Sequence, residues 1–131
     1  MAESLDKRGT GGDQMFRFEQ LKVWHKAVEL YDVVDGLAER FPAKVRFGLA
    51  DQFRRAVLSV SSNIAEGSGR ETAKEFRYFL GVAKGSVFEM VRIAFICQRR
   101  GLITDQQHGE LYSRAEEVSK MLTALKRSSA S

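Results

Sequence analysis

The chain of 131 residues contains few side chains whose types and spacing could support chemistry. A di-iron helical bundle needs carboxylates on facing helices together with Glu-x-x-His pairs. Only the segment from Asp105 to His108 comes close to that pattern. An aspartate at a helix start is also favoured by the helix dipole, for a structural reason alone. We therefore predict that the chain binds no metal and needs no other cofactor.

A glycine-rich segment, Gly67-Ser68-Gly69-Arg70, resembles a phosphate-binding loop only superficially. It lacks the Gly-Lys-Ser/Thr ending and the preceding strand that such a loop requires. Backbone amides at the next helix start, together with Arg70, could bind one anion, but a plain turn between helices is the simpler interpretation. Cys97, the only cysteine, lies on an apolar helical stripe, where a thiol behaves as a small hydrophobe. Because no nucleophile has a base beside it, we predict no catalytic site and no enzymatic activity.

The most specific polar feature is a stripe of short hydrogen-bonding groups and one guanidinium, spaced by three and four residues. This polar stripe consists of Gln52, Arg55, Ser59, Asn63 and Glu66. An ordinary solvated helix face mixes lysine and glutamate, so the stripe is typical of a face whose polar groups are satisfied against another surface. A ligand-binding face is the functional alternative.

The polar stripe should pair with the helix that follows it, if the two helices are antiparallel. Residues equidistant from the turn then lie side by side, so Arg55 or Gln52 should pair with Ser86 or Glu89, within the subunit or across an interface. The two backbones would approach closely at glycines of the second helix. These glycines are Gly81 and Gly85.

The formal net charge is +4, and the positive charge is concentrated in the middle of the chain. From Arg40 to Arg100 there are 12 basic and 5 acidic residues, a net charge of +7. Such a segment indicates either a polyanion-binding face or a solvated surface, and composition alone favours the second. The candidate phosphate contacts are Arg54, Arg70, Arg77, Arg92, Arg99 and Arg100.

The elements that must position these residues are all helical. Apolar residues recur at spacings of three and four, and no stretch alternates as a half-buried strand does. Short connections require neighbouring helices to be antiparallel, so the fold class is all-α, an antiparallel up-down four-helix bundle with short loops. The predicted organisation is a disordered tail over 1–15, the bundle over 16–127 and a second tail over 128–131.

Helix boundaries follow from local signals. Phe41-Pro42 ends the first helix, expected over 18–40, because the residue before proline avoids the helical basin. The second helix should begin between residues 44 and 51 and end near Glu66, where glycines would supply a left-handed stop. Capping boxes predict the starts of the third and fourth helices, and Gly101 should end the third. The two boxes are Thr72 with Glu75 and Thr104 with Gln107.

The third helix is apolar on more than one side, and the first helix has a similar excess. A four-helix bundle buries one stripe of each helix, so the remaining apolar faces predict self-association. Alternatively, the third helix is central and the tails cover the rest. The interface candidates are Trp24, Tyr31, Leu58, Tyr78, Val82, Ile93 and Ile96.

The chain is expected to be cytoplasmic and not to enter a membrane. No charged-then-apolar leader begins it, which argues against secretion. Its most apolar stretch, from Ser86 to Cys97, is interrupted by Glu89 and Arg92 and is too short to cross a bilayer core of about 30 Å.

One set of motifs spans most of the predicted bundle: Leu21, Trp24, Phe41-Pro42, Gln52-Phe53-Arg54-Arg55-Ala56, Ser59, Asn63-Ile64-Ala65-Glu66-Gly67, Gly69-Arg70, Gly85-Ser86 and Glu89. These motifs resemble those of the four-helix-bundle proteins encoded in intervening sequences of large ribosomal RNA genes. The resemblance covers about 18–125. It implies a cytosolic bundle that forms ring-shaped homopentamers. A related branch of accessory proteins in diversity-generating retroelements contacts reverse transcriptase and nucleic acid through a basic surface.

Two functions from different classes remain open. The first is a homo-oligomer that binds RNA or DNA through phosphate contacts, without reading bases. The second is a protein–protein scaffold with no role in nucleic-acid binding. Convergence of the basic residues on one surface of the assembled oligomer would favour the first function, and a scattered distribution would favour the second.

Overall fold

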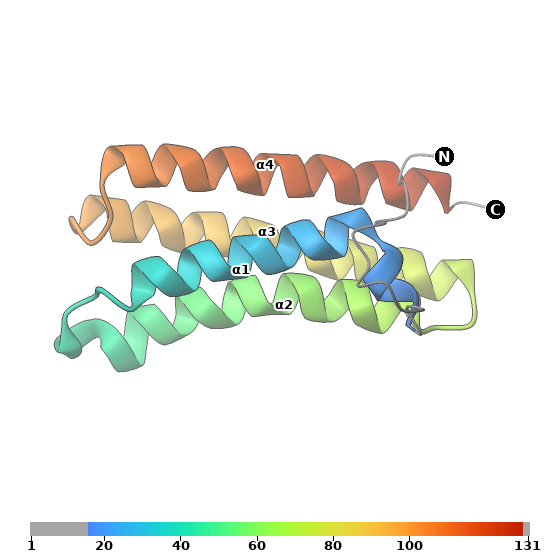
Figure 1. Cartoon of the computed structure of the whole chain (residues 1–131), viewed down its shortest axis with the longest axis horizontal. Helices are drawn as coiled ribbons and strands as arrows, with labels where there is room; N and C mark the ends of the chain where they lie inside the picture. The colour runs from blue at the N-terminus through green and yellow to red at the C-terminus, as the bar shows by residue number, and fades with distance from the viewer. Residues whose placement is uncertain (1–15, 130–131) are drawn as a thin grey trace, which may run out of the picture.

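A computed structural model describes residues 16–129, which form one bundle of four long helices (Figure 1). These residues contain no β-strand, and the all-α fold class is confirmed. The long helices are α1 (Lys22–Ala38), α2 (Asp51–Ser68), α3 (Ala73–Arg99) and α4 (Asp105–Ser128). Three short elements precede α1 or join it to α2: the 3-10 helices η1 (Arg17–Gln20) and η2 (Ala43–Val45) and the π-helix η3 (Arg46–Ala50).

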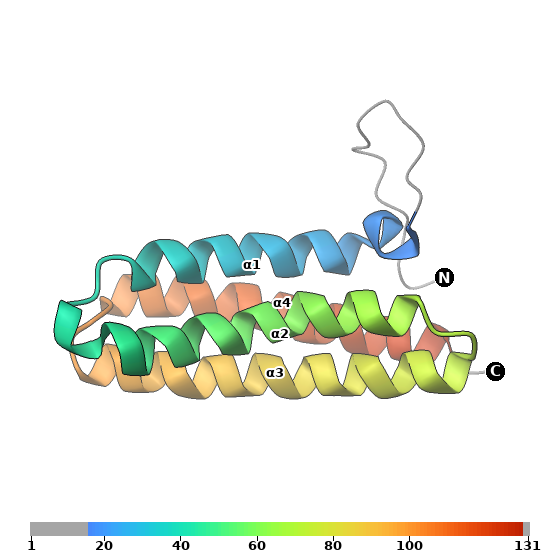
Figure 2. The same cartoon turned by 90° about the horizontal axis from the view of Figure 1, so that it is seen from below.

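Consecutive helices run antiparallel, so two connections lie at one end of the bundle and one at the other (Figures 1 and 2). The α1–α2 and α3–α4 connections share one end. The α2–α3 turn lies at the other, near η1 and the end of α4. The predicted tail over 1–15 lies outside the described residues, as do residues 130 and 131. α4 continues through Ser128, so the second tail begins later than the sequence predicts.

The helices begin and end largely where local chemistry predicts. The Thr104 hydroxyl accepts a hydrogen bond from the backbone N–H of Gln107 at 3.0 Å. In return, the side-chain oxygen of Gln107 accepts one from the backbone N–H of Thr104 at 2.9 Å. Gly101 has φ +74° and supplies the left-handed stop after α3. α2 ends at Ser68, close to the predicted position, but the predicted left-handed conformation is wrong, because Gly69 has φ −89° and is right-handed.

The core of α3 and α4 is formed by the apolar residues that recur at spacings of three and four and make one stripe along each helix. All of their stripe residues are buried, namely Phe76, Leu80, Ala83, Val87, Met90, Ala94, Cys97, Leu111, Ala115, Val118, Leu122 and Leu125. Ile93 belongs to this core too, at 3% exposed, and its assignment to a subunit interface is wrong. It lies seven residues, two helical turns, from Ser86 on the side of α3 that faces α2. A helix packed between two neighbours buries a wider arc than one stripe.

The close approach of α2 and α3 occurs at a different glycine from those predicted. A Cβ atom at Gly67 would lie 2.7 Å from Phe79 Cβ and 3.2 Å from Phe76 Cδ1. In contrast, a Cβ at Gly85 would meet nothing within 4 Å, and one at Gly81 would meet only Lys126 of α4, at 3.3 Å. Gly67, from the α2 side, therefore allows the two helices to pack tightly.

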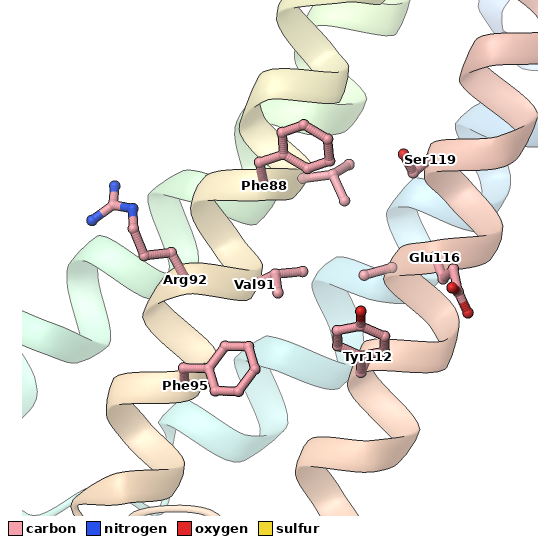
Figure 3. A pocket seen from close by; sticks show the side chains of 9 residues that line it. Phe88, Val91, Arg92, Phe95, Tyr112, Glu116 and Ser119 are labelled. Carbon is pink, nitrogen blue, oxygen red and sulfur yellow. The ribbon is translucent and has the colours of Figure 1, made fainter.

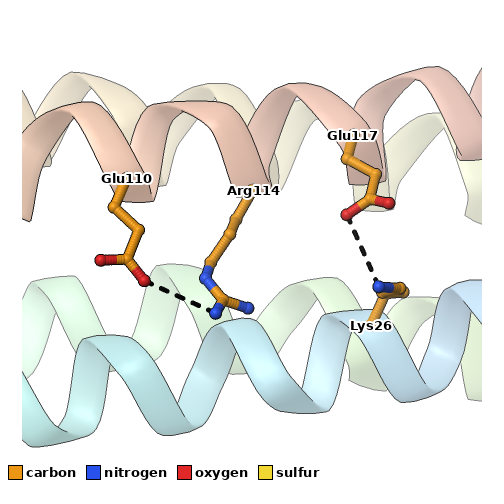
Figure 4. Close-up of polar contacts among 4 residues, drawn as sticks. All are labelled: Lys26, Glu110, Arg114 and Glu117. Carbon is orange, nitrogen blue, oxygen red and sulfur yellow. Dashed lines mark ion pairs between the residues drawn. The ribbon is translucent and has the colours of Figure 1, made fainter.

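Ion pairs on the surface contribute little to holding α1 against α4. Lys26 of α1 lies 3.7 Å from Glu117 of α4, and Arg114 pairs with Glu110 within α4 at 3.5 Å (Figure 4). Exposed pairs of this kind are worth about 0–1 kcal/mol. The apolar core, with Val23, Ala27 and Leu30 of α1 fully buried, provides most of the stabilisation.

Candidate functional site

The polar stripe of α2 divides into three parts in the folded chain. The Ser59 hydroxyl accepts hydrogen bonds from the Ser86 hydroxyl of α3 and from the side-chain amide of Asn63, both at 2.9 Å. Glu66 forms an ion pair with Arg70 at 2.8 Å. The prediction that part of the stripe is satisfied against another helix therefore holds at Ser59, whereas the Asn63 side chain donates to Ser59 within α2 itself.

Arg55 and Gln52 behave differently. Both are exposed, and neither contacts Ser86 or Glu89. Within the subunit the predicted pairing is thus wrong. Ser86 donates its hydrogen bond to Ser59 instead, which lies one helical turn closer to the α2–α3 connection. Pairing of Arg55 across an interface stays a prediction.

The structure does not gather the six arginines that were predicted to contact phosphate. Four of them interact within the chain. Arg54 contacts Asp35 at 2.6 Å, and Arg70 contacts Glu66 at 2.8 Å. Arg77 donates to the Ser129 carbonyl at 2.9 Å, and Arg92 lies 4.0 Å from Glu89. Arg99 and Arg100 are exposed at the far end of α3. Arg70 and Arg77 lie toward the opposite end of the bundle, so the six do not form one surface within a single chain.

Arg54 has a structural role between α1 and α2. Its Nε donates to Asp35, and this hydrogen bond raises the pKa of the guanidinium above its ordinary value. The side chains of Arg54 and Asp35 are 25% and 42% exposed, so solvent screens the pair only partly. The pair fixes the register of the two helices near the start of α2.

We expect Asp35→Asn to lower the free energy of unfolding by about 1 kcal/mol, because a charge-assisted hydrogen bond to a half-buried arginine is weakened. Urea unfolding monitored by circular dichroism would measure the loss. The control is Glu117→Gln, which weakens the more exposed and longer pair with Lys26 and should cost less than about 0.5 kcal/mol. Equal losses in the two variants would show that the Arg54 pair is no more than a surface contact.

The candidate metal and anion sites are occupied by other interactions. Asp105 accepts a hydrogen bond from Gln98 at 2.9 Å, and the His108 ring packs on Phe95 with centroids 4.7 Å apart. Within 16–129 no three histidine, cysteine, aspartate or glutamate side chains cluster as metal ligands would. At the alternative anion site considered for the turn, Arg70 pairs with Glu66 and lies over the Phe79 ring, while Gly67 is part of α2.

Cys97 is fully buried in the core, and burial raises the pKa of its thiol to about 11. The nucleophilic thiolate is therefore scarce at neutral pH. The side chain packs as the sequence predicted.

An apolar groove with a volume of about 520 Å³ lies between α3 and α4. Phe88, Val91 and Phe95 line it from α3, and Tyr112 lines it from α4. Their side chains face one another, whereas Arg92 and Glu116 point away on either side (Figure 3). An open groove of this composition fits apolar side chains of another molecule.

Exposure separates the interface candidates. Leu58 (50%), Tyr78 (66%), Val82 (36%) and Ile96 (40%) are exposed. Trp24 and Tyr31 are half-buried and pack against the core of their own chain. The candidates did not include Phe88, Phe95 or Tyr112, which are 62%, 52% and 45% exposed. Their spacing on the helices, off the core stripes, was the signal that could have identified them.

Sequence reasoning also missed a group of cations around the α1–α2 connection. Arg40, Lys44 and Arg46 are exposed there, at the same end of the bundle as Arg99 and Arg100. We call these five residues the basic end. Phe47, which is 88% exposed, directly follows Arg46 on the π-helix η3, at the same end of the bundle.

Comparisons with known proteins identify relatives of this chain. Residues 19–124 match a protein family described as 23S rRNA-intervening sequence protein. A solved structure from Bacteroides thetaiotaomicron, a protein of unknown function from the S23 ribosomal protein family, is similar with a TM-score of 0.74. That pair is 21% identical, and the likeness covers 79% of this chain and 97% of the other, so it supports the shared fold. No curated protein matches the chain.

Proposed function

The chain belongs to the 23S rRNA-intervening sequence protein family, and from this premise we propose that it is a non-enzymatic homo-oligomer that binds RNA or other nucleic acid through a basic surface. The resemblance of its motifs favours a pentamer in the cytoplasm. Among the described helices, none is long and apolar enough to cross a membrane. One observation carries the proposal of self-association, the exposed apolar surface of α3.

Five large apolar side chains of α3 remain exposed in the single chain: Tyr78, Val82, Phe88, Phe95 and Ile96. Full burial of each such side chain contributes about 1.5–3 kcal/mol. These side chains are already partly buried, so each contributes a fraction of that amount when a second copy covers it. The contributions from both copies add up to favour assembly against the roughly 4–15 kcal/mol that association costs in lost motion. Neighbouring Tyr112 extends this surface onto α4.

We expect light scattering on the purified protein to give a mass several times 14.8 kDa, with five subunits favoured by the resemblance. The physical reason is the apolar surface of α3, which water solvates poorly. A monomeric mass at micromolar concentration would contradict the proposed assembly.

The nucleic-acid part of the proposal is supported by the net charge of +7 between Arg40 and Arg100. An oligomer repeats this charge in every subunit, and lysine and arginine contact phosphates without reading the sequence. Binding should therefore be similar for unrelated sequences. It should weaken at least about tenfold between 50 and 200 mM salt if several phosphates are neutralised in each complex.

The alternative function is a protein–protein scaffold, which the apolar α3–α4 groove favours. Recovery of the tagged protein from its host, with analysis of bound RNA and bound protein in the same sample, distinguishes the two. Enrichment of RNA supports nucleic-acid binding. Recovery of one protein partner without RNA supports the scaffold.

A further inference from the structure

We propose that the basic end binds single-stranded nucleic acid, with one base stacked on Phe47 and the flanking phosphates bound by the cations at the same end of the bundle. This inference rests on the proposed nucleic-acid function and specifies its site and the form of its ligand. It depends on the position of one aromatic side chain and on five cations that two distant parts of the chain bring to one end of the bundle.

Phe47 is the most exposed of the large apolar side chains in the described structure, at 88%. Its neighbours explain why it cannot turn inward. Phe41 is buried and stacks on Phe53 with centroids 6.3 Å apart, while Val45 and Leu49 pack against the core. The connection is thus anchored on both sides of Phe47, and the π-helix η3 presents the ring to solvent. Irregular π-helical turns are frequent at functional sites.

The cations of the basic end have no acidic partner within the described chain. Arg40, Lys44, Arg46, Arg99 and Arg100 are all exposed, and none takes part in an ion pair with a residue of 16–129. Four acidic residues of the described chain lie at this end of the bundle: Asp35, Glu39, Asp51 and Asp105. Asp35 is paired with Arg54, and Asp105 accepts a hydrogen bond from Gln98.

Helix dipoles account for only part of this arrangement. Arg40, Arg99 and Arg100 lie at or just beyond the C-termini of α1 and α3, where a positive charge is favourable. Lys44 and Arg46 instead precede α2, where the dipole disfavours them. Two cations placed against the dipole beside an exposed ring indicate a requirement for an anion rather than for helix stability.

An exposed aromatic ring among cations matches the way single strands are bound. Bases of a single strand are free to stack on an aromatic side chain, and the backbone follows the positive charge. In a duplex the faces of the bases are already stacked on one another, so only the cations would contribute. The basic end should therefore prefer single strands, whereas contacts through phosphates alone would show no such preference.

The experiment measures fluorescence anisotropy of the full-length protein with a labelled oligouridine of about 20 nucleotides, longer than the site size of a typical single-strand binder, and with an RNA duplex of equal length, at low salt. We expect the wild type to bind the single strand more tightly. Phe47→Ala should weaken single-strand binding by at least about fivefold, the smallest loss expected for one stacked base, and leave duplex binding unchanged. Circular dichroism and light scattering confirm that each variant keeps its fold and its mass.

Two further variants act as controls. Phe16→Ala removes another exposed phenylalanine, 60% exposed, from the opposite end of the bundle, and should leave both affinities unchanged. Lys44→Gln with Arg46→Gln should weaken binding of both RNAs and make the dependence on salt less steep, by about one unit of slope for each phosphate that is no longer neutralised.

Several results would overturn the inference. If the wild type binds nucleic acid but Phe47→Ala has no effect, or weakens binding of both RNAs equally, the site is wrong and the proposed function survives. A fall in oligomer mass with Phe47→Ala would assign Phe47 to a subunit interface. Displacement of oligouridine by polyglutamate at an equal concentration of charge would assign the site to acidic peptides. If the wild type binds neither RNA, the proposed nucleic-acid function fails together with the inference.

Discussion

Ile93→Asp is expected to unfold the bundle rather than to dissociate subunits. Ile93 is 3% exposed and belongs to the core. Truncating a buried isoleucine costs about 2–5 kcal/mol, and placing a carboxylate in the same space adds the cost of its desolvation. The total of about 4 kcal/mol or more is a large part of the roughly 5–15 kcal/mol that stabilises a typical domain.

Thermal unfolding followed by circular dichroism measures this effect. We expect the variant either to lose its cooperative transition or to melt at least about 15 °C lower than the wild type. The matched control is Ile96→Asp, three residues further along α3, where the side chain is 40% exposed. That variant should keep its helical spectrum and weaken assembly. A folded but monomeric Ile93→Asp protein would contradict this expectation and show that Ile93 lies in a subunit interface.

Gly67→Ala is expected to lower the free energy of unfolding by about 1–3 kcal/mol, although alanine is the better helix former. The added methyl group would lie 2.7 Å from Phe79 Cβ. A Cβ atom cannot move away by a change of rotamer, so α2 and α3 would have to separate. Separation also disturbs the contact with Phe76, a buried residue of the core.

Gly36→Ala provides the opposite result with the same change of residue. Gly36 is an exposed position of α1, and a Cβ there meets nothing within 4 Å. The substitution should therefore stabilise the protein by about 0.5–1 kcal/mol. Urea unfolding of both variants compares the two values directly. If both replacements stabilise the protein, the conclusion that Gly67 is needed for close packing of α2 and α3 is wrong.

The sequence predicted the helices and most of the core because these features depend on local chemistry. A period of about 3.6 residues identifies the buried stripe of α3, and a hydroxyl followed three residues later by glutamine identifies the start of α4. Pro42 restricts the backbone of the residue before it, and Gly101 adopts a positive φ itself, so both mark helix ends through local backbone conformation. Such signals require no knowledge of the neighbouring helices.

Tertiary structure decided which side of each helix meets a neighbour. Ile93 and Ile96 are both apolar and lie off the main stripe, yet only Ile93 is buried against the rest of the bundle. Likewise, Gly67 and Gly85 are both helical glycines, and the rotation of α2 and α3 about their axes places only Gly67 at a close contact. Rotation and crossing of helices depend on how all the side chains pack together, so one helix's own pattern does not specify them.

The same distinction applies to the charged residues. Composition located the positive charge in the middle of the chain, but which cations stay free depends on partners far away in the sequence. Arg54 is held by Asp35, 19 residues earlier, and Arg77 by the Ser129 carbonyl, 52 residues later. The antiparallel arrangement then brings Arg46 and Phe47 to the same end as Arg99, because alternate connections of an up-down bundle lie at the same end. The sequence thus determined the elements and their polarity, and the packing of the helices determined which surface is available for binding.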